Sequence, residues 1–236
     1  LGMKDTWFLD CTGLTDEGHY STASDIAIMS RELITKHPKI LEFTSIWLDT
    51  FRDGTFTLNN TNRLVRFYEG VNGLKTGFTS KAGYCLAATA SRNNLSLISV
   101  ILGGPDSDTR FNETRKLLDY GFANFEKVKV NSKGEIRQQV LVKNGLKMEV
   151  NAIFADDVVL LLKKGTKGNI ESKVVIDENI KAPLSEGQKI GKVVYSLNGE
   201  ELGTADLVSD REVKKASFLR LFFRMVLGWL GIGRAG

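Results

Sequence analysis

Histidine, cysteine and proline are scarce in this chain, whose 236 residues include two histidines, two cysteines and three prolines. So few cysteines and histidines exclude a disulfide framework and a zinc site, and we expect no metal and no cofactor. Cys11 and Cys85 could form one bridge in an oxidising compartment, but two isolated buried thiols are the simpler expectation. The scarcity of proline, with 42% hydrophobic and 25% charged residues, excludes a disordered or collagen-like chain.

The surplus of positive charge lies at the end of the chain. The formal net charge is +4, but residues 211–236 carry six basic side chains and one acidic side chain, which gives this tail +5. The preceding 210 residues therefore sum to −1. A body of this charge offers no basic face to a nucleic acid, so we expect no nucleic-acid partner.

The first part of the chain predicts a helix followed by turns. Residues 21–37 begin with hydroxyl and Asp side chains suited to a helix N-cap, and the pattern stops at Pro38. The apolar residues at helical spacing are Ile26, Met29, Leu33 and Ile34. In residues 39–70 the cluster of Asn59, Asn60 and Asn62 favours turns over a long regular element.

A small sheet and a second helix are expected next. Residues 71–79, 84–91 and 95–104 are apolar runs typical of adjacent antiparallel strands, the last two joined by a tight turn. Residues 106–126 then predict a helix behind an Asp/Ser cap, packed back on the sheet. Its apolar stripe consists of Phe111, Leu118, Phe122 and Phe125.

From Lys127 onward, short runs of β-branched and apolar residues alternate with turn residues, among them Asn144-Gly145 and Asn198-Gly199. Asn-Gly between such runs is a strong hairpin signal. The length suits two modest domains. We therefore expect an α+β chain with a first domain in residues 1–126, a small all-β domain in 127–208, and a separate tail in 209–236.

Lys75-Thr76-Gly77 stands in the later part of the first expected strand and is followed by Phe78. An ammonium group, a hydroxyl group and a glycine without a side chain would let a substrate backbone lie along the strand, with its anionic group facing Lys75 and Thr76. The triplet alone is a weak signal, since a chain of this length contains a given triplet roughly one time in twenty. The surrounding sequence must therefore carry the interpretation.

The triplet is one of three motifs that penicillin-recognising serine enzymes carry, the others being Ser-x-x-Lys and Ser-x-Asn. Longer strings resemble, in the same order, the later part of the catalytic domain of D-alanyl-D-alanine carboxypeptidases, the low-molecular-mass penicillin-binding proteins. These strings are residues 1–14, 19–34, 71–90, 97–104 and 115–126. Residues 181–202 resemble the β-rich domain that follows in that family, and the tail resembles its membrane anchor.

The resemblance implies a partial β-lactamase/transpeptidase-like domain in residues 1–126, an antiparallel sheet with helices, followed by the small all-β domain and a C-terminal amphipathic helix. It implies part of a serine-type carboxypeptidase that removes the terminal D-alanine from peptidoglycan stem peptides ending in D-Ala-D-Ala. Such an enzyme is inhibited by β-lactams. It would be held on the extracytoplasmic face of a bacterial membrane through residues 211–236.

The resemblance also implies roles for five substrate-binding residues. Lys75 would keep the site positive, Thr76 would bind the terminal carboxylate of the substrate, and Gly77 would let the substrate approach. Phe78 would give its backbone N–H to the oxyanion hole. Arg110 matches a family arginine and is a candidate second carboxylate contact, the alternative being an arginine in solvent at a helix N-terminus.

The chain departs from the family pattern in its serines. None of the fifteen serines has a lysine three residues later, so the catalytic nucleophile is absent from these residues. Ser91-Arg92-Asn93 spells Ser-x-Asn, but it follows Lys75-Thr76-Gly77 and falls in an expected turn, so we interpret it as coincidence. No signal peptide follows Leu1, and in the family both missing motifs lie upstream of this region. We therefore expect the C-terminal portion of a longer enzyme, inactive by itself.

Three other groups of reactive side chains favour structural interpretations. His19-Tyr20 could form an acid/base pair, but it precedes a helix cap in a stretch that resembles family scaffold. Tyr84-Cys85 lies in an expected strand and belongs with the core. Asp156-Asp157 could be paired carboxylates, but adjacent strand residues point to opposite faces, so a solvated loop is the better interpretation.

The tail predicts an amphipathic helix, because residues 218–232 include eleven large apolar residues. Ser217, Arg220, Arg224, Gly228 and Gly231 share one face at about 100° per residue, and Phe218, Phe222, Val226, Trp229 and Leu230 lie opposite. The segment is shorter than the roughly 20 residues that span a bilayer. We expect it in the membrane interface, with its arginines toward anionic head groups; the alternative is docking on the β domain.

Two alternatives to the carboxypeptidase stay open at this point. A shortened penicillin-binding scaffold could serve as a non-catalytic module that binds or positions peptidoglycan, and the reading frame before Leu1 would separate this module from the enzyme. A β-lactamase would share Lys75-Thr76-Gly77, but it would not explain the β domain or the tail.

Overall fold

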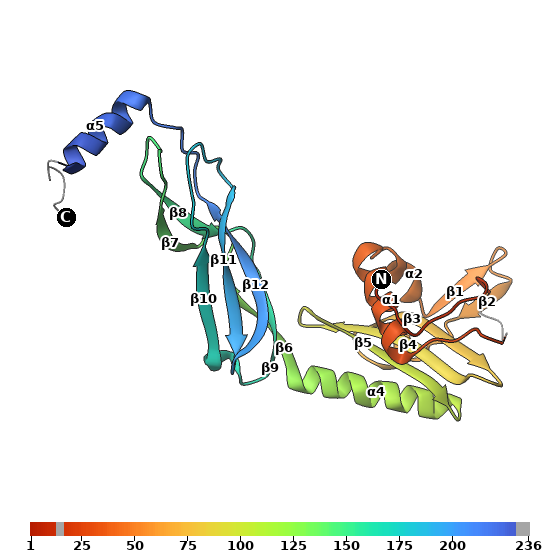
Figure 1. The fold of residues 1–236 in the computed structure, drawn as a ribbon. Helices are drawn as coiled ribbons and strands as arrows, with labels where there is room; N and C mark the ends of the chain where they lie inside the picture. The colour runs from red at the N-terminus through yellow and green to blue at the C-terminus, as the bar shows by residue number, and fades with distance from the viewer. Residues whose placement is uncertain (13–16, 230–236) are drawn as a thin grey trace. The chain divides into compact units, whose positions relative to one another are not determined.

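The computed structural model describes residues 1–12 and 17–229, and the chain divides into two compact units, Leu1–Phe125 and Glu126–Gly236 (Figure 1). In the first unit, strands β3 (Val71–Thr79), β4 (Gly83–Arg92) and β5 (Leu95–Gly104) form an antiparallel sheet in that order. Arg92 pairs with Leu95, and Asn93 and Asn94 have φ of 48° and 63°. A two-residue turn with positive φ at both positions matches the twist of the strands, which confirms the predicted hairpin.

Helices α1 (Ala23–Lys36) and α4 (Ser107–Asn124) cover opposite faces of this sheet (Figure 1). The caps are as predicted: the Thr22 side chain accepts a hydrogen bond from the Asp25 N–H, and the Asp106 side chain accepts one from the Thr109 N–H. Phe111 and Leu118 are buried in the core beneath α4. The predicted stripe was wrong at Phe125, which lies beyond the helix end because the chain turns there into an extended strand.

The stretch between α1 and β3 contains short elements only, as its asparagines indicated. They are helix α2 (Ile40–Thr44), strands β1 (Leu48–Phe51) and β2 (Phe56–Asn59), which form a hairpin, and helix α3 (Leu64–Phe67). Asn60 and Asn62 bond to backbone groups of neighbouring segments, so this turn is attached to the sheet.

Up to Trp229, where the described part of the chain ends, the second unit contains seven strands in two sheets. Strands β10 (Ile170–Ile176), β11 (Lys189–Leu197), β12 (Glu200–Ser209), β8 (Glu149–Phe154) and β7 (Ile136–Leu141) form one sheet in that order. Strands β6 (Phe125–Asn131) and β9 (Val158–Lys163) form the other, and a short 3-10 helix, η1 (Lys167–Asn169), precedes β10. Alternate residues of these strands are buried in a common core that includes Phe154, Leu162 and Val193.

The two Asn-Gly pairs have different surroundings. Asn198-Gly199 forms the predicted two-residue hairpin between β11 and β12, with φ of 51° and 83°. Asn144-Gly145 lies instead in a longer connection between β7 and β8, residues 142–148. Gly145 forms a bridge with Lys215, and the Leu146 N–H donates to the Lys214 carbonyl. These contacts with the end of the chain are why a tight turn does not form there.

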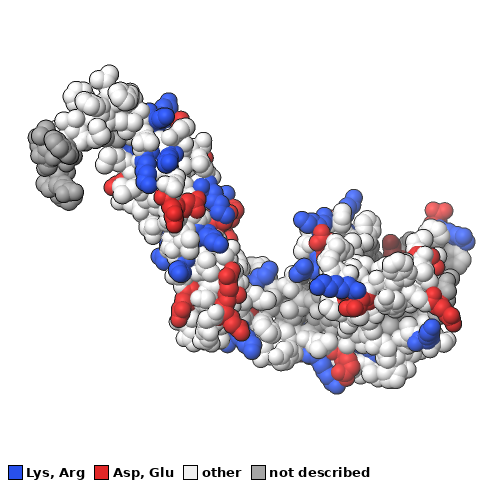
Figure 2. Space-filling view, in the orientation of Figure 1, with Lys and Arg blue, Asp and Glu red and all other residues white. Residues whose placement is uncertain are grey.

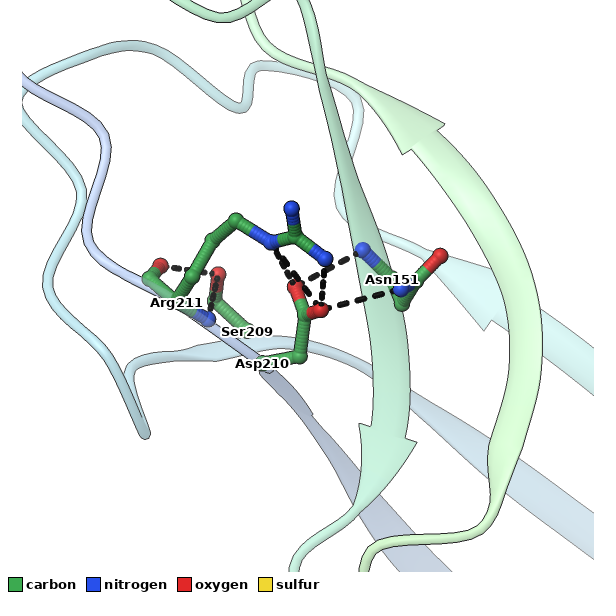
Figure 3. Close-up of polar contacts among 4 residues, drawn as sticks. All are labelled: Asn151, Ser209, Asp210 and Arg211. Carbon is green, nitrogen blue, oxygen red and sulfur yellow. Dashed lines mark hydrogen bonds and ion pairs between the residues drawn. The ribbon is translucent and has the colours of Figure 1, made fainter.

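A polar cluster at the end of β12 attaches the following segment to β8 (Figure 3). The Asp210 carboxylate accepts hydrogen bonds from the Asn151 backbone N–H at 3.0 Å and from its amide at 2.9 Å, and it forms an ion pair with Arg211. Beyond it, Val213 pairs with Leu184 and is buried, and the Ala216 N–H donates to the Asn144 carbonyl. Residues 210–216 are therefore part of the β unit rather than of the terminal helix.

Helix α5 (Phe218–Trp229) follows, and it presents large apolar side chains to the surface. Phe218 is 82% exposed, and Leu219, Phe223 and Met225 are also exposed. Figure 2 shows this helix as mostly neither acidic nor basic. Of the residues expected in it, Leu230, Gly231 and Ile232 lie outside the described part of the chain. Among the described helices, none has the length and hydropathy required to cross a membrane.

The remaining structural expectations concern cysteines and carboxylates. Both cysteines are free; Cys85 is half-buried, but Cys11 is exposed, so the expectation of a buried thiol was wrong for Cys11. Asp156 and Asp157 lie in the exposed loop between β8 and β9, as predicted. Asp157 accepts a hydrogen bond from the Lys133 backbone N–H and pairs with the Lys129 ammonium, and the former contact lowers its pKa.

Candidate substrate-binding site

Strand β3 carries Lys75, Thr76, Gly77 and Phe78, and it is an edge strand of its sheet among the described residues. Thr76 lies opposite Leu86 of β4, and Gly77 lies opposite Cys85. An edge strand has backbone donors and acceptors that no neighbouring strand uses, and an extended peptide can pair with them. The predicted position of the triplet is therefore confirmed, and its strand can accept a further backbone.

Lys75 and Phe78 are exposed on this strand. One of the three donors of the Lys75 ammonium bonds to the Thr76 carbonyl at 2.5 Å. The Phe78 ring is 57% exposed and packs on the Tyr84 ring, with 4.3 Å between the centroids. Tyr84 and Cys85 are half-buried rather than core residues, and they lie near the start of β4.

Thr76 is 7% exposed, and its hydroxyl lies 2.6 Å from the Thr61 hydroxyl. The turn that carries Thr61 is held by its two flanking asparagines. The Asn62 amide donates to the Gly73 carbonyl of β3 at 2.9 Å, and the Asn60 amide donates to the carbonyls of Thr44 and Ile46. The asparagines of this stretch predict only turns, because nothing in the sequence places it beside β3.

Arg110 lies in the first turn of α4 and is 7% exposed, so the alternative of an arginine in solvent was wrong. Its Nη1 donates to the carbonyls of Gly77 and Cys85, both at 3.2 Å. Its Nη2 lies 3.4 Å from the Ser107 hydroxyl, and its buried Nε has no hydrogen-bond partner among the described residues. Arg110 therefore supports the backbone of the triplet, and its buried Nε–H is left unpaired by the described residues.

A second guanidinium group lies near Arg110. Arg63 donates to the hydroxyl of Ser107 at 3.2 Å and pairs with Asp108, and both arginines lie 4.7 Å from the centre of the Phe111 ring. Burial, followed by the like charge of Arg63, lowers the pKa of Arg110. A buried cation with an unused donor is stabilised by a bound anion.

The other residues weighed from the sequence take structural positions. His19 accepts a hydrogen bond from the Leu9 backbone N–H and packs beside the Phe8 ring, and Tyr20 forms a bridge with Trp7. Ser91 lies at the end of β4 with its hydroxyl 2.9 Å from that of Ser96, next to the predicted turn. The site that remains has a cation, a hydroxyl group and an open strand edge, a set of groups that suits a peptide with an anionic end.

Two family models match consecutive parts of the chain. Residues 1–106 match D-alanyl-D-alanine carboxypeptidase, and residues 125–215 match the penicillin-binding protein 5 C-terminal domain. The first contains the triplet on β3, and the second corresponds to the β unit.

Individual relatives agree with these matches. D-alanyl-D-alanine carboxypeptidase DacF of Bacillus subtilis is 37% identical over 97% of this chain, and DacA of Haemophilus influenzae is 36% identical over 98%. The chain spans 60% of the length of each.

Solved structures show the same likeness. A crystal structure of penicillin binding protein 5 from Haemophilus influenzae superposes with a TM-score of 0.75 at 36% identity, covering 91% of this chain and 62% of that one. A peptidoglycan synthesis regulatory factor from Streptococcus pneumoniae superposes with a TM-score of 0.68 at 27% identity, covering 84% of this chain and 59% of that one. With both parts matched in sequence and in fold, the chain belongs to the D-alanyl-D-alanine carboxypeptidase family.

Proposed function

We propose that this chain is the substrate-binding part of a serine-type D-Ala-D-Ala carboxypeptidase, which removes the terminal D-alanine from peptidoglycan stem peptides during cell-wall remodelling. The observation that carries the proposal is the placement of Lys75-Thr76-Gly77 on the open edge of β3, with Arg110 behind it. The bacterial relatives are named D-alanyl-D-alanine carboxypeptidases, which supports the proposed reaction.

Each residue has a proposed task in binding the substrate. The stem peptide lies along β3, where Gly77 leaves room for its backbone. The Thr76 hydroxyl donates to the terminal carboxylate, and the guanidinium group of Arg110, which contacts the Gly77 carbonyl, contributes positive charge beside it. Lys75 keeps the site positive, and the backbone N–H of Phe78 donates to the carbonyl oxygen that becomes an oxyanion.

The reaction is acyl transfer, and its nucleophile is a serine outside these 236 residues. The serine oxygen bonds to the carbonyl carbon between the two D-alanines, and the serine proton passes to the leaving amino group. The peptide bond breaks and D-alanine leaves. Water then hydrolyses the acyl-enzyme, which releases the shortened peptide and restores the serine. β-Lactams present a similar carboxylate and a reactive carbonyl, so we propose them as inhibitors that acylate the same serine.

The test is covalent labelling with a fluorescent penicillin, followed by mass spectrometry to locate the adduct. It compares the 236-residue chain with an extended protein, in which the chain is preceded by the Ser-x-x-Lys and Ser-x-Asn segment of its own reading frame. We expect an adduct on that serine in the extended protein and none on the shorter chain. An adduct on the 236-residue chain, or a reading frame without both motifs, would overturn the proposal.

We also propose that α5 attaches the protein to the extracytoplasmic face of the bacterial membrane. Phe218, Leu219, Phe223 and Met225 are exposed on it, and its sequence places Arg220 and Arg224 on one narrow face. Such a helix lies in the interface, with apolar side chains among the acyl chains and arginines at anionic head groups. The proposed anchor begins at Ser217, since residues 210–216 contact the β unit.

A further inference from the structure

Thr61 is a surface residue whose hydroxyl lies against a buried partner. Its oxygen is 2.6 Å from the Thr76 oxygen, and Thr76 is 7% exposed. The two residues are 15 positions apart and come from different elements, so local chain geometry does not impose the contact. The hydrogen bonds of Asn60 and Asn62 hold the intervening turn in place. The Thr61 hydroxyl is thereby fixed beside the residue proposed to bind the substrate carboxylate.

The number of protons in this pair restricts what Thr76 can do. A hydroxyl group donates one hydrogen bond and accepts up to two. When Thr76 donates to Thr61, its only proton is occupied, and its oxygen would face a carboxylate that can only accept. When Thr61 donates to Thr76, the Thr76 proton is free for the carboxylate. A bound anion therefore selects the second arrangement, in which the two consecutive hydrogen bonds strengthen each other.

We propose that Thr61 is a positioning residue for the substrate carboxylate: it donates its proton to Thr76 and so directs the Thr76 proton toward the anion. This inference rests on the proposed function, in which Thr76 binds the terminal carboxylate. The same turn leads into Arg63, which shares the Ser107 hydroxyl with Arg110. The same turn therefore reaches both residues proposed to act on the substrate carboxylate: it contacts Thr76 directly and Arg110 through the shared Ser107 hydroxyl.

The contact does not involve the nucleophile, so it can be tested with the 236-residue chain itself. The measurement is an NMR titration of backbone amide signals with acetyl-D-Ala-D-Ala and, in parallel, with its C-terminal amide, which has no negative charge. The variants are Thr61→Val, which keeps the shape without the hydroxyl; Thr61→Ser, which restores it; Thr61→Ala, in case valine disturbs the fold; and Thr76→Val. Thr57→Val, at an exposed threonine of β2, is the matched control.

We expect the parent chain to bind the carboxylate form more tightly than the amide, with shifted signals in residues 71–79. Thr61→Val and Thr61→Ala should weaken binding of the carboxylate form by about threefold to tenfold, the effect of one neutral hydrogen bond. Binding of the amide should stay unchanged. Thr61→Ser and Thr57→Val should bind the carboxylate form like the parent. Thr76→Val should lose more affinity for the carboxylate form than Thr61→Val does.

Other outcomes identify which statement fails. If Thr76→Val loses binding while Thr61→Val and Thr61→Ala bind the carboxylate form like the parent, the role of Thr61 is wrong and the proposed function is unaffected. Thr61 is a structural residue if Thr61→Val and Thr61→Ala weaken binding of both ligands equally. It is also a structural residue if these variants shift the backbone N–H signals of the free protein throughout the first unit. If the parent shows no preference for the carboxylate form, or Thr76→Val has no effect, the proposed carboxylate site is wrong, and this inference with it.

Discussion

The guanidinium group of Arg110 donates to the carbonyl oxygen of Gly77 over 3.2 Å, which connects the first turn of α4 to the strand of the triplet. The same nitrogen donates to the Cys85 carbonyl of the neighbouring strand. Because Arg110 is buried, its removal leaves both carbonyl oxygens without this partner in a place that water reaches poorly.

We therefore expect Arg110→Met to lower the free energy of unfolding by about 1 to 3 kcal/mol, the usual effect of unsatisfied buried polar groups. Urea unfolding followed by circular dichroism measures this. The matched control is Lys116→Met in the same helix, where the lysine side chain is 71% exposed. Equal stability of Arg110→Met and Lys116→Met would show that the two backbone contacts contribute nothing.

Lys75→Ala in the extended protein should slow acylation by a labelled penicillin about 100-fold or more, since groups directed at developing charge contribute on that scale in acyl transfer. The fold should persist because Lys75 is exposed. Rates of labelling, with circular dichroism as the check on folding, test this. Lys81→Ala, an exposed lysine in the turn after β3, is the control and should react at the parent rate. A loss of less than tenfold at Lys75 would assign it a structural role.

Asp210 gives the β unit a pH-dependent contribution to stability. The hydrogen bond from Arg211, supported by those from Asn151, lowers the pKa of Asp210 to about 2 from its usual 3.8. Because the pKa of Asp210 is lower in the folded chain than in the unfolded chain, the folded state is stabilised when the pH is above the pKa of the unfolded chain. This stabilisation is lost as the pH falls through the pKa of the folded chain. The stabilisation is therefore complete above about pH 5 and lost between pH 4 and 2, and it amounts to at most about 2 kcal/mol.

Asp210→Asn removes this contribution, so the parent should be more stable than the variant at pH 6, and the difference should shrink as the pH approaches 2. Thermal unfolding of both proteins across this range measures the difference. Asp156→Asn is the control, because the Asp156 side chain is 85% exposed and lies 3.5 Å from the Lys133 ammonium. A parent-to-variant difference that does not change with pH would contradict the assignment.

Removal of residues 217–236 should abolish binding of the chain to anionic liposomes while leaving the β unit folded. The cut belongs after Ala216, because Val213 and Ala216 are buried and a deletion from residue 211 would also remove them. Cosedimentation with vesicles of anionic and of neutral lipid measures binding. Arg220→Glu, which reverses one charge in the helix, should weaken binding to the anionic vesicles only. Equal binding by the full and the shortened chain would refute the anchor.

Local sequence signals predicted the elements that depend on neighbours along the chain. Helices α1 and α4 have a capping residue and an apolar period of their own, and the turns at Asn93 and Asn198 need only residues that tolerate positive φ. The prediction was wrong where distant segments compete with the local signal. The backbone groups of Lys214 and Lys215 pair with the backbone of Leu146 and Gly145, so the Asn144-Gly145 pair does not form a tight turn.

Some features of the candidate site could likewise be predicted from the sequence, and others depend on the packing of distant segments. The residues of Lys75-Thr76-Gly77 and their strand follow from the sequence, because the motif and the apolar run are contiguous. The burial of Arg110 and the contact between Thr61 and Thr76 depend on packing α4 and the Asn60–Asn62 turn against β3. Hydrogen bonds of this kind form between residues that only the folded chain brings within 3 Å or so, and no spacing along the sequence encodes them.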